Sequence, residues 1–253
     1  MKSIDLNADL GEGYGPWSMG DDAAMLALVT SANVACGGHA SDPDTMFRTL
    51  TLAREQGVSV GAHPSYPDLA GFGRRRLPAT TSEIERFVAA QVGALLAIAA
   101  LAGHPVRYVK PHGALANVAA AERNVADAIA RSVRALDRDL AVLAISGTEL
   151  AHAADAAGLR VFHEIYADRG YTAAGQLVPR SEPGAVIHDA EAAAARLVAF
   201  LASGAMPTAD GGTVRLAADS ICVHGDNPAA VTMANRIRAA LSDQGLSIAP
   251  FLG

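Results

Sequence analysis

Acidic, amide, imidazole and cationic side chains of this 253-residue chain gather in short motifs at regular spacing. Asp5, Asn7 and Asp9 alternate along one apolar stretch, and Lys110 and His112 are likewise two residues apart in another. Alternate residues of a β-strand point to the same side. Each motif therefore presents its polar groups together, where carboxylates and imidazoles can act as general acids and bases or hold a metal ion.

Phosphate-binding chemistry has less support in the sequence. Neither of the two lysines, Lys2 and Lys110, follows a glycine, so the phosphate loop GxxxxGK[ST] is absent. The glycine-flanked basic segment 71–76 could hold phosphate or carboxylate oxygens through Arg74, or it could be a solvated loop. Residues 224–228 lead into an expected helix start, which is a second place that suits an anion.

The motifs lie at the ends of apolar runs that we expect to be strands. These runs alternate with helical stretches, which indicates repeated βα units and a parallel sheet. The expected strands are Ser3–Asp9, Ser31–Cys36, Val58–His63, Arg107–His112, Leu140–Ser146, Arg160–Tyr166 and Ser220–His224, with a weak eighth at Ser247–Ala249. The alternation predicts an α/β fold, a single-domain TIM-like (β/α) barrel over residues 1–253, with seven strands as the favoured number.

Local signals mark the expected helices and one long loop. Asp42 followed by Pro43 predicts a helix start, and Gly57 predicts its end. Apolar residues at helical spacing predict its buried face: Met46, Phe47, Leu50 and Ala53. The segment 168–185 has turn residues and no clear period, which is typical of a functional loop.

Composition and charge narrow the class of protein. The chain is 51% hydrophobic and 18% charged, which provides a sizeable core and excludes disorder. Its net charge of −6 argues against nucleic acid as a partner. The most apolar stretch, 87–103, falls short of the roughly 20 residues of a bilayer span and follows helix-capping residues at 80–83, so we expect a soluble helix and no membrane partner. A start without an apolar signal region and only two cysteines favour the cytoplasm.

Residues that can do chemistry follow six of the seven expected strands. In a (β/α) barrel these strand ends meet at one face, where the active site lies. The residues are Asp5, Asn7, Asp9, Glu12, Asn33, Cys36, His39, His63, Asp68, Lys110, His112, Asn117, Glu164, Asp168, Arg169, His224 and Asp226. An internal ion-pair network is the alternative interpretation of the acidic first strand, and a small core residue is the simpler interpretation of Cys36.

Seven motifs, in unbroken order over nearly the whole chain, resemble the LamB/YcsF family. They are Asp5–Glu12 (DLNADLGE), Ser31–Gly37 (SANVACG), Gly61–Pro64 (GAHP), Gly71–Arg75 (GFGRR), Lys110–Leu115 (KPHGAL), Ala167–Arg169 (ADR) and Cys222–Asp226 (CVHGD). The resemblance implies ATP-dependent opening of the 5-oxoproline (pyroglutamate) lactam to L-glutamate, with release of ADP and phosphate. It also implies a complex with 5-oxoprolinase subunits B and C. Whether ATP contacts this chain stays open.

On that resemblance we hypothesise that the lactam oxygen is phosphorylated within the complex and that this chain delivers water to the ring carbon. Asp9, alone or with Glu12, would be the general base, and His112 would stabilise the oxyanion or protonate the leaving nitrogen. Lys110 and Arg74 would hold carboxylate or phosphate oxygens. The other expected substrate-binding residues are Asn7, Asn33, His39, Asp168, Arg169, His224 and Asp226.

A more distant resemblance concerns a metal. Asp9, His63 and His112 resemble the Asp/His/His metal site of carbohydrate deacetylases with a seven-stranded barrel, which also hydrolyse an amide. A divalent metal on these three residues is therefore a candidate cofactor beside ATP. Two alternative functions remain: a metal-dependent deacetylase of N-acetyl sugars that acts without ATP, and a non-catalytic scaffold for partner subunits.

Overall fold

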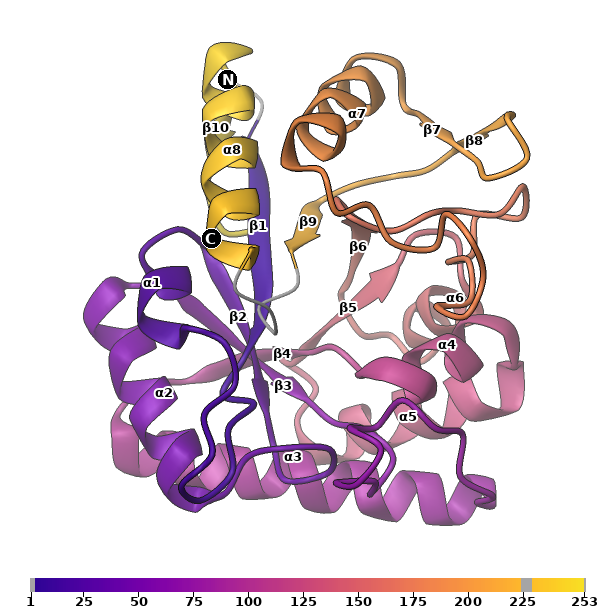
Figure 1. The fold of residues 1–253 in the computed structure, drawn as a ribbon. Coiled ribbons are helices and arrows are strands. Elements are labelled where there is room, and N and C mark those ends of the chain that lie inside the picture. Colours follow the sequence, from indigo (N-terminus) through magenta and orange to yellow (C-terminus); the bar gives the residue numbers. More distant parts are fainter. Residues whose placement is uncertain (1–2, 224–228, 253) are drawn as a thin grey trace.

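The computed structural model describes residues 3–223 and 229–252 (Figure 1). Within these residues, seven parallel strands form a ring, and β9 closes it by pairing with both β6 and β1. The strands of the ring, in order, are β1 (Ser3–Leu10), β2 (Ser31–Ala35), β3 (Ser59–His63), β4 (Val106–Val109), β5 (Ala141–Ile145), β6 (Val161–Tyr166) and β9 (Ser220–Val223). The predicted seven-stranded (β/α) barrel is confirmed.

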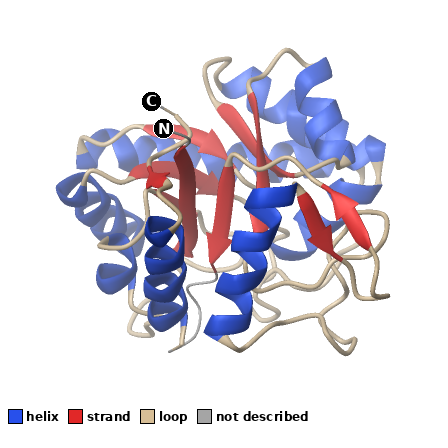
Figure 2. Ribbon diagram, turned by 90° about the horizontal axis from the view of Figure 1, so that it is seen from above, coloured by secondary structure: helices blue, strands red, loops and turns tan. Residues whose placement is uncertain are grey.

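Helices surround the strands, as Figure 2 shows. They are α1 (Asp22–Leu26), α2 (Pro43–Gln56), α3 (Thr81–Ala102), α4 (Gly113–Ala121), α5 (Arg123–Leu136), α6 (Glu149–Ala156), α7 (Ala190–Ser203) and α8 (Ala230–Asp243). A small antiparallel ribbon of β7 (Ala205–Pro207) and β8 (Thr213–Arg215) follows α7. The core lies between the outward face of the strands and the inner faces of these helices.

The predicted start and end of α2 are confirmed. The Asp42 carboxylate accepts hydrogen bonds from the backbone N–H groups of Asp44 and Thr45, Pro43 takes the first helical position, and Gly57 ends the helix in the left-handed conformation at φ 67°. The expected buried face is only partly right, because Phe47 is 44% exposed.

The most apolar helix, α3, belongs to the outer layer of the barrel. It is long and apolar enough to cross a membrane by length and composition. Instead it packs against α2 and α5, and it buries Ile84, Val88 and Leu95 against the core. Its first turn has the expected capping box, in which Thr80 and Glu83 bind each other's backbone N–H. This packing buries 33% of its most apolar window, and Leu101 near its end is 75% exposed.

The last expected strand is shorter than predicted and lies outside the ring. It is β10 (Ser247–Ile248), which pairs with the first two residues of β1. The segment after β6 is a long connection to α7, as predicted, but it is ordered by two isolated bridges, Arg169 with Val186 and Tyr171 with Leu177. This segment folds back over the mouth of the barrel, where its residues line the pocket described below.

The inside of the barrel is polar along β1, whereas branched apolar side chains fill most (β/α) barrels. Nearer the amino end of β1, the buried Asp5 carboxylate accepts hydrogen bonds from the hydroxyls of Thr30 and Ser31, both at 2.7 Å, and from the hydroxyl of Ser220. Two residues further along β1, the Asn7 amide donates to the Ser220 hydroxyl at 2.7 Å. The alternating polar residues of the first strand therefore point into the barrel, as the sequence predicted.

Candidate active site

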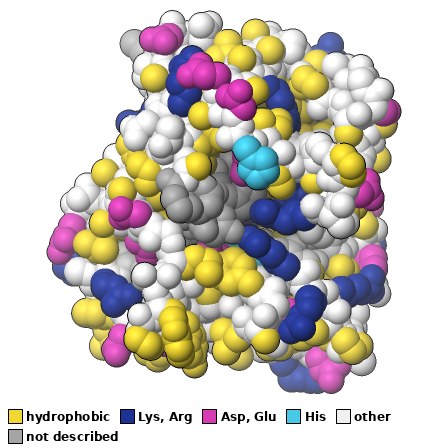
Figure 3. All heavy atoms as spheres, viewed as in Figure 1, with side chains coloured by type: hydrophobic (Ala, Val, Ile, Leu, Met, Phe, Trp, Pro, Cys, Tyr) yellow, Lys and Arg dark blue, Asp and Glu magenta, His cyan; other side chains and the backbone are white. Residues whose placement is uncertain are grey.

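A pocket of about 340 Å³ opens at the carboxyl ends of the barrel strands, which is within the size range of small-molecule sites. It is lined by Asp9, Glu12, His63, Arg74, Pro111, His112, Gly113, Ala114, Ala116, Asn117, Tyr166, Arg169, Leu177, Pro179 and Arg180. The molecular surface is hollowed at this face, and Lys and Arg side chains lie along one side of the hollow (Figure 3). The pocket lies where the sequence placed the active site.

Asp9 is held at the floor of the pocket by groups from three other strands. Its Oδ1 atom accepts hydrogen bonds from Asn33 Nδ2 at 2.9 Å and from Lys110 Nζ at 3.0 Å. The same oxygen lies 3.4 Å from His63 Nε2. The second amide hydrogen of Asn33 goes to Asn7 Oδ1 at 2.7 Å. This network fixes the orientation of the Asp9 carboxylate at the edge of the cavity.

Lys110 lies behind Asp9 rather than in the pocket. Its ammonium is 2% exposed and forms a second ion pair with Glu164 Oε1 at 2.8 Å. Burial opposes the charged form, but the neighbouring Asp9, Cys222 and Glu164 outweigh it and raise the pKa of Lys110 well above its usual value. Lys110 is therefore a buried cation that neutralises two carboxylates. It does not line the pocket, although we expected it to hold oxygens of the substrate.

Four buried side chains form a cluster beside Asp9: Glu12, His39, His63 and His112. One ligand atom from each lies within 4.8 Å of the others. Glu12 Oε1 is 3.0 Å from His39 Nε2 and 3.8 Å from His112 Nδ1. The rings of His39 and His112 stack in parallel with centroids 3.7 Å apart. The cluster contains two of the three expected metal ligands, and Glu12 and His39 complete it, while Asp9 is held by Lys110 and Asn33.

Two backbone carbonyls fix the tautomers of the paired histidines. His63 Nδ1 is 2.6 Å from the Lys110 carbonyl, and His112 Nε2 is 2.9 Å from the Phe72 carbonyl. A carbonyl only accepts, so both of these nitrogens carry hydrogen, which leaves lone pairs on His63 Nε2 and His112 Nδ1. These two atoms face each other at 3.0 Å. Two lone pairs at this distance repel each other unless a proton or a metal cation is shared between them.

The donor set fits a divalent metal. Imidazole nitrogen and carboxylate oxygen are zinc ligands, and Zn–N bonds of 2.0–2.1 Å place two tetrahedral ligands about 3.3 Å apart, within a few tenths of an ångström of the His63–His112 separation. His39 Nδ1, in addition, is buried and has no hydrogen-bond partner among the described residues. The cluster would have to contract for all four residues to bind at once, because Glu12 Oε1 lies 3.8 Å from His112 Nδ1.

Two imidazoles of the cluster, those of His39 and His112, are neutral at neutral pH. Burial is the main cause that lowers the pKa of His39 and of His112 well below the usual value. The neighbouring histidines lower both pKa values further, because a second positive charge nearby is unfavourable. A neutral imidazole can bind a metal or accept a proton, so both chemistries are available at this site.

The glycine-flanked segment 71–76 covers the histidine cluster. A Cβ atom on Gly73 would lie 2.9 Å from His112 Cδ2 and 2.8 Å from His39 Cβ, and its φ of 63° is left-handed, so glycine is required there. Of the three arginines in this segment, only Arg74 lines the pocket. Arg75 and Arg76 form ion pairs with Asp68 and Glu122. The segment therefore contributes one cation to the site, and its three arginines do not bind an anion together.

Most of the expected site residues come together, although not all reach the pocket. Asp9, Glu12, His63, Arg74, His112 and Arg169 line it. Asn7, Asn33, His39 and Lys110 are buried next to these residues, and Asp168 is buried at the same strand end. His224 and Asp226 lie outside the described residues. The expectations missed Tyr166, Leu177 and Arg180, and the only signal that pointed to the last two was the long loop that contains them.

Comparisons with known proteins agree with this picture. The chain is 51% identical over 249 residues to a protein of Rhodopseudomonas palustris strain BisB5 that is named as the A subunit of 5-oxoprolinase, covering 98% of each chain. It is 53% identical over 251 residues to the protein of the same name from Azorhizobium caulinodans, covering 99% of each. Among solved structures, the lactam utilization protein of Thermus thermophilus matches with a TM-score of 0.92 and 43% identity, over 98% of this chain and 99% of that one.

A second solved structure shares the fold alone. It is a protein from Enterococcus faecalis described as a candidate cellobiose-phosphate cleavage protein, and it matches with a TM-score of 0.58 at 12% identity, over 99% of this chain and 97% of that one. The sequence profile of the LamB/YcsF family, by contrast, matches residues 4–253. With that match and relatives of about 50% identity over their full lengths, the chain belongs to the LamB/YcsF family.

Proposed function

We propose that this chain is the lactam-opening subunit of a cytoplasmic, ATP-dependent 5-oxoprolinase, which converts 5-oxoproline to L-glutamate with hydrolysis of ATP to ADP and phosphate. Relatives with half of their residues identical are named as the A subunit of this enzyme, and the name implies further subunits. The observation that carries the proposal is the pocket itself, in which a carboxylate and a histidine cluster face arginine side chains. Two buried free cysteines suit the reducing cytoplasm.

ATP chemistry is assigned to the partners, subunits B and C. The sequence contains no phosphate loop, so the chain would receive a lactam that has been activated by phosphorylation of its oxygen. Activation is needed because the amide of the lactam ring is stabilised by resonance. Arg74 at the pocket wall is placed to hold oxygens of the activated group.

The hydrolytic step would use residues at the floor of the pocket. Asp9, kept ionised by the buried Lys110, takes a proton from water as the water adds to the ring carbon. Glu12 lies close enough to share this task through His112. The proton that Asp9 has taken from water would then pass to the ring nitrogen, with the Nδ1 lone pair of His112 as the relay, as the C–N bond breaks. The opened product would be an acyl phosphate, and a second water molecule would release its phosphate to give glutamate. A divalent metal, when bound by Glu12, His39, His63 and His112, would lower the pKa of water at this position.

Glutamate formation from 5-oxoproline tests the proposal, with ATP and either this chain alone or the chain mixed with subunits B and C. We expect glutamate only in the complete mixture. Glutamate from the chain alone would show that it has its own nucleotide site. No glutamate with folded protein and active partners would overturn the proposal, and release of acetate from N-acetyl sugars by the zinc-loaded chain would then identify a deacetylase. Full activity of a chain with alanine at Asp9 and His112 would leave only a scaffold role.

A further inference from the structure

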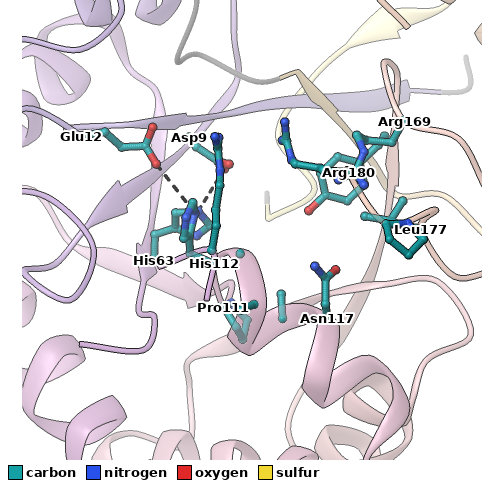
Figure 4. A pocket seen from close by; sticks show the side chains of 15 residues that line it. Asp9, Glu12, His63, Pro111, His112, Asn117, Arg169, Leu177 and Arg180 are labelled. Carbon is teal, nitrogen blue, oxygen red and sulfur yellow. Dashed lines mark hydrogen bonds and ion pairs between the residues drawn. The ribbon is translucent and has the colours of Figure 1, made fainter. Parts of the chain in front are cut away.

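The two ends of the pocket differ in chemical character. Asp9, Glu12, His63 and His112 lie at one end, and Arg169 and Arg180 lie across the cavity from them (Figure 4). The rest of the lining is mostly apolar and includes Pro111, Ala114, Ala116 and Leu177, together with the polar Asn117 and Tyr166. A small molecule that fits this pocket therefore presents its reacting group to the first end, a negative group to the arginines, and its hydrocarbon part to the apolar lining.

The two arginines have different tasks. Arg169 is 4% exposed, and its guanidinium donates to the backbone carbonyls of Ala185 at 2.9 Å and Val178 at 2.6 Å. It is therefore a positioning residue that ties down the turn between these two positions. Arg180 stands on that turn and is exposed to the cavity. Burial is the main cause that lowers the pKa of Arg169, and the positive charge of Arg180 lowers it further.

The turn that carries Arg180 is built into the fold. Gly170 donates its N–H to the Ala185 carbonyl at 3.0 Å and accepts from the Val178 N–H at 2.9 Å. A Cβ atom on Gly170 would lie 2.4 Å from the Gly184 carbonyl oxygen, so this close approach of two backbone segments requires glycine. The position of Arg180 is thus set by backbone contacts that no ligand is needed to form.

We propose that Arg180 binds the carboxylate of the lactam substrate and thereby selects an acidic lactam over a neutral one. This inference rests on the proposed function and adds the specificity element to it. The guanidinium fork matches a carboxylate with two parallel hydrogen bonds. In 5-oxoproline the carboxylate and the carbonyl lie on the two carbons that flank the ring nitrogen, so they point to different sides of the ring, and its CH₂ groups suit the apolar lining.

The test measures KM and kcat for glutamate formation by the complete complex with wild type, Arg180→Gln and Arg180→Lys. Arg138→Gln, at an exposed position in the turn after α5, is the matched control for loss of a positive charge. 2-Pyrrolidinone, which lacks the carboxylate, and inorganic phosphate are the competing ligands, and their inhibition constants are measured for each variant. Thermal unfolding of each isolated chain confirms that the fold is kept.

We expect Arg180→Gln to raise KM for 5-oxoproline roughly 10- to 100-fold, the usual worth of hydrogen bonds between charged groups, while kcat changes by less than about threefold. The inhibition constant of 2-pyrrolidinone should stay the same, Arg180→Lys should recover part of the loss, and Arg138→Gln should behave as wild type. An unchanged KM in a working complex would overturn this inference and leave the proposed function intact. A raised constant for phosphate with an unchanged KM would show that Arg180 holds a phosphoryl group instead. Absence of turnover by the wild-type complex would overturn the proposed function, and the inference with it.

Discussion

Lys110 places its ammonium 3.0 Å from Asp9 Oδ1 while remaining 2% exposed and outside the lining of the pocket. The same ammonium is 2.8 Å from Glu164 Oε1. One buried cation thus pairs with two buried carboxylates, and it also donates to Asn7 Oδ1 at 3.2 Å and to Cys222 Sγ at 3.1 Å. Lys110 therefore holds the Asp9 carboxylate in place and favours its charged form.

Lys110→Met should therefore destabilise the fold strongly. Removing one partner of a buried ion pair leaves the other charge uncompensated, at a cost of about 3–5 kcal/mol in the free energy of unfolding. Lys110→Met combined with Glu164→Gln should be more stable than Lys110→Met alone, because one of the two stranded carboxylates has been removed. Urea unfolding gives the free energy of unfolding of the wild type and of the two variants. Equal stability of the single variant and wild type would show that the ammonium is dispensable.

Asp9→Asn should abolish glutamate formation by the complex and preserve the fold. The amide oxygen can still accept from Asn33 and Lys110, whereas a general base contributes about 10²- to 10⁴-fold to the rate. Turnover with subunits B and C, together with thermal unfolding, tests this. Asp155→Asn, at an exposed position at the end of α6, serves as the control. Near-normal activity of Asp9→Asn would move the assignment to Glu12, and Glu12→Gln is the variant that would then lose activity.

The histidine cluster predicts stoichiometric metal binding by the isolated chain. We expect about one equivalent of zinc or cobalt(II) after dialysis, with the cobalt visible spectrum reporting nitrogen and oxygen ligands. His112→Asn should lose most of the metal, whereas His152→Asn, an exposed histidine on α6, should retain it. Metal content below a tenth of an equivalent in the wild type would indicate that His63 and His112 share a proton instead.

Gly73→Ala should disturb the cluster without replacing any of its own residues. The added methyl would meet His39 and His112 at less than 3 Å, and the left-handed backbone at this position disfavours alanine. We expect a loss of stability of about 1 kcal/mol or more and a reduced metal affinity. Gly93→Ala, in α3 with nothing within 4 Å of the added carbon, should leave metal binding as it is. Identical metal affinity in both variants would show that the segment 71–73 does not set the cluster geometry.

Much of the fold could be predicted because its signals are local. The capping residues of α2 and α3 and the alternation of apolar runs depend only on near neighbours, and they specified the barrel. The sequence also showed that polar side chains share one face of the barrel. It could not show which groups touch: Glu12 and His39 meet at 3.0 Å only because β1 and β2 pair in a particular register, and that register arises from the closed sheet.

Other parts of the site depend on contacts between distant segments. Arg180 lies in a stretch without periodicity, and its place follows from the bonds of Arg169 to the carbonyls of Val178 and Ala185. The depth of Lys110 likewise follows from the pairing of β4 with its neighbours, because the spacing of Lys110 and His112 is the same whether the lysine points into the pocket or behind it. Phe47 fits the helical period of the buried face, yet it lies at the edge of that face and is exposed.

Asp5 provides the last prediction, on the pH dependence of stability. Burial raises its pKa from 3.8 to about 6, although the hydroxyls of Ser220, Thr30 and Ser31 favour the ionised form. Because the folded state holds this proton more tightly than the unfolded state, the stabilising contribution is complete below about pH 4 and is lost as the pH rises through about 6. Asp5→Asn, which cannot titrate, should therefore gain about 3 kcal/mol relative to wild type between pH 4 and pH 7. Urea unfolding across this range measures the difference in the free energy of unfolding between Asp5→Asn and wild type. The contributions of the other titrating groups cancel in this difference. A difference that stays constant with pH would show that Asp5 has an ordinary pKa in the folded barrel.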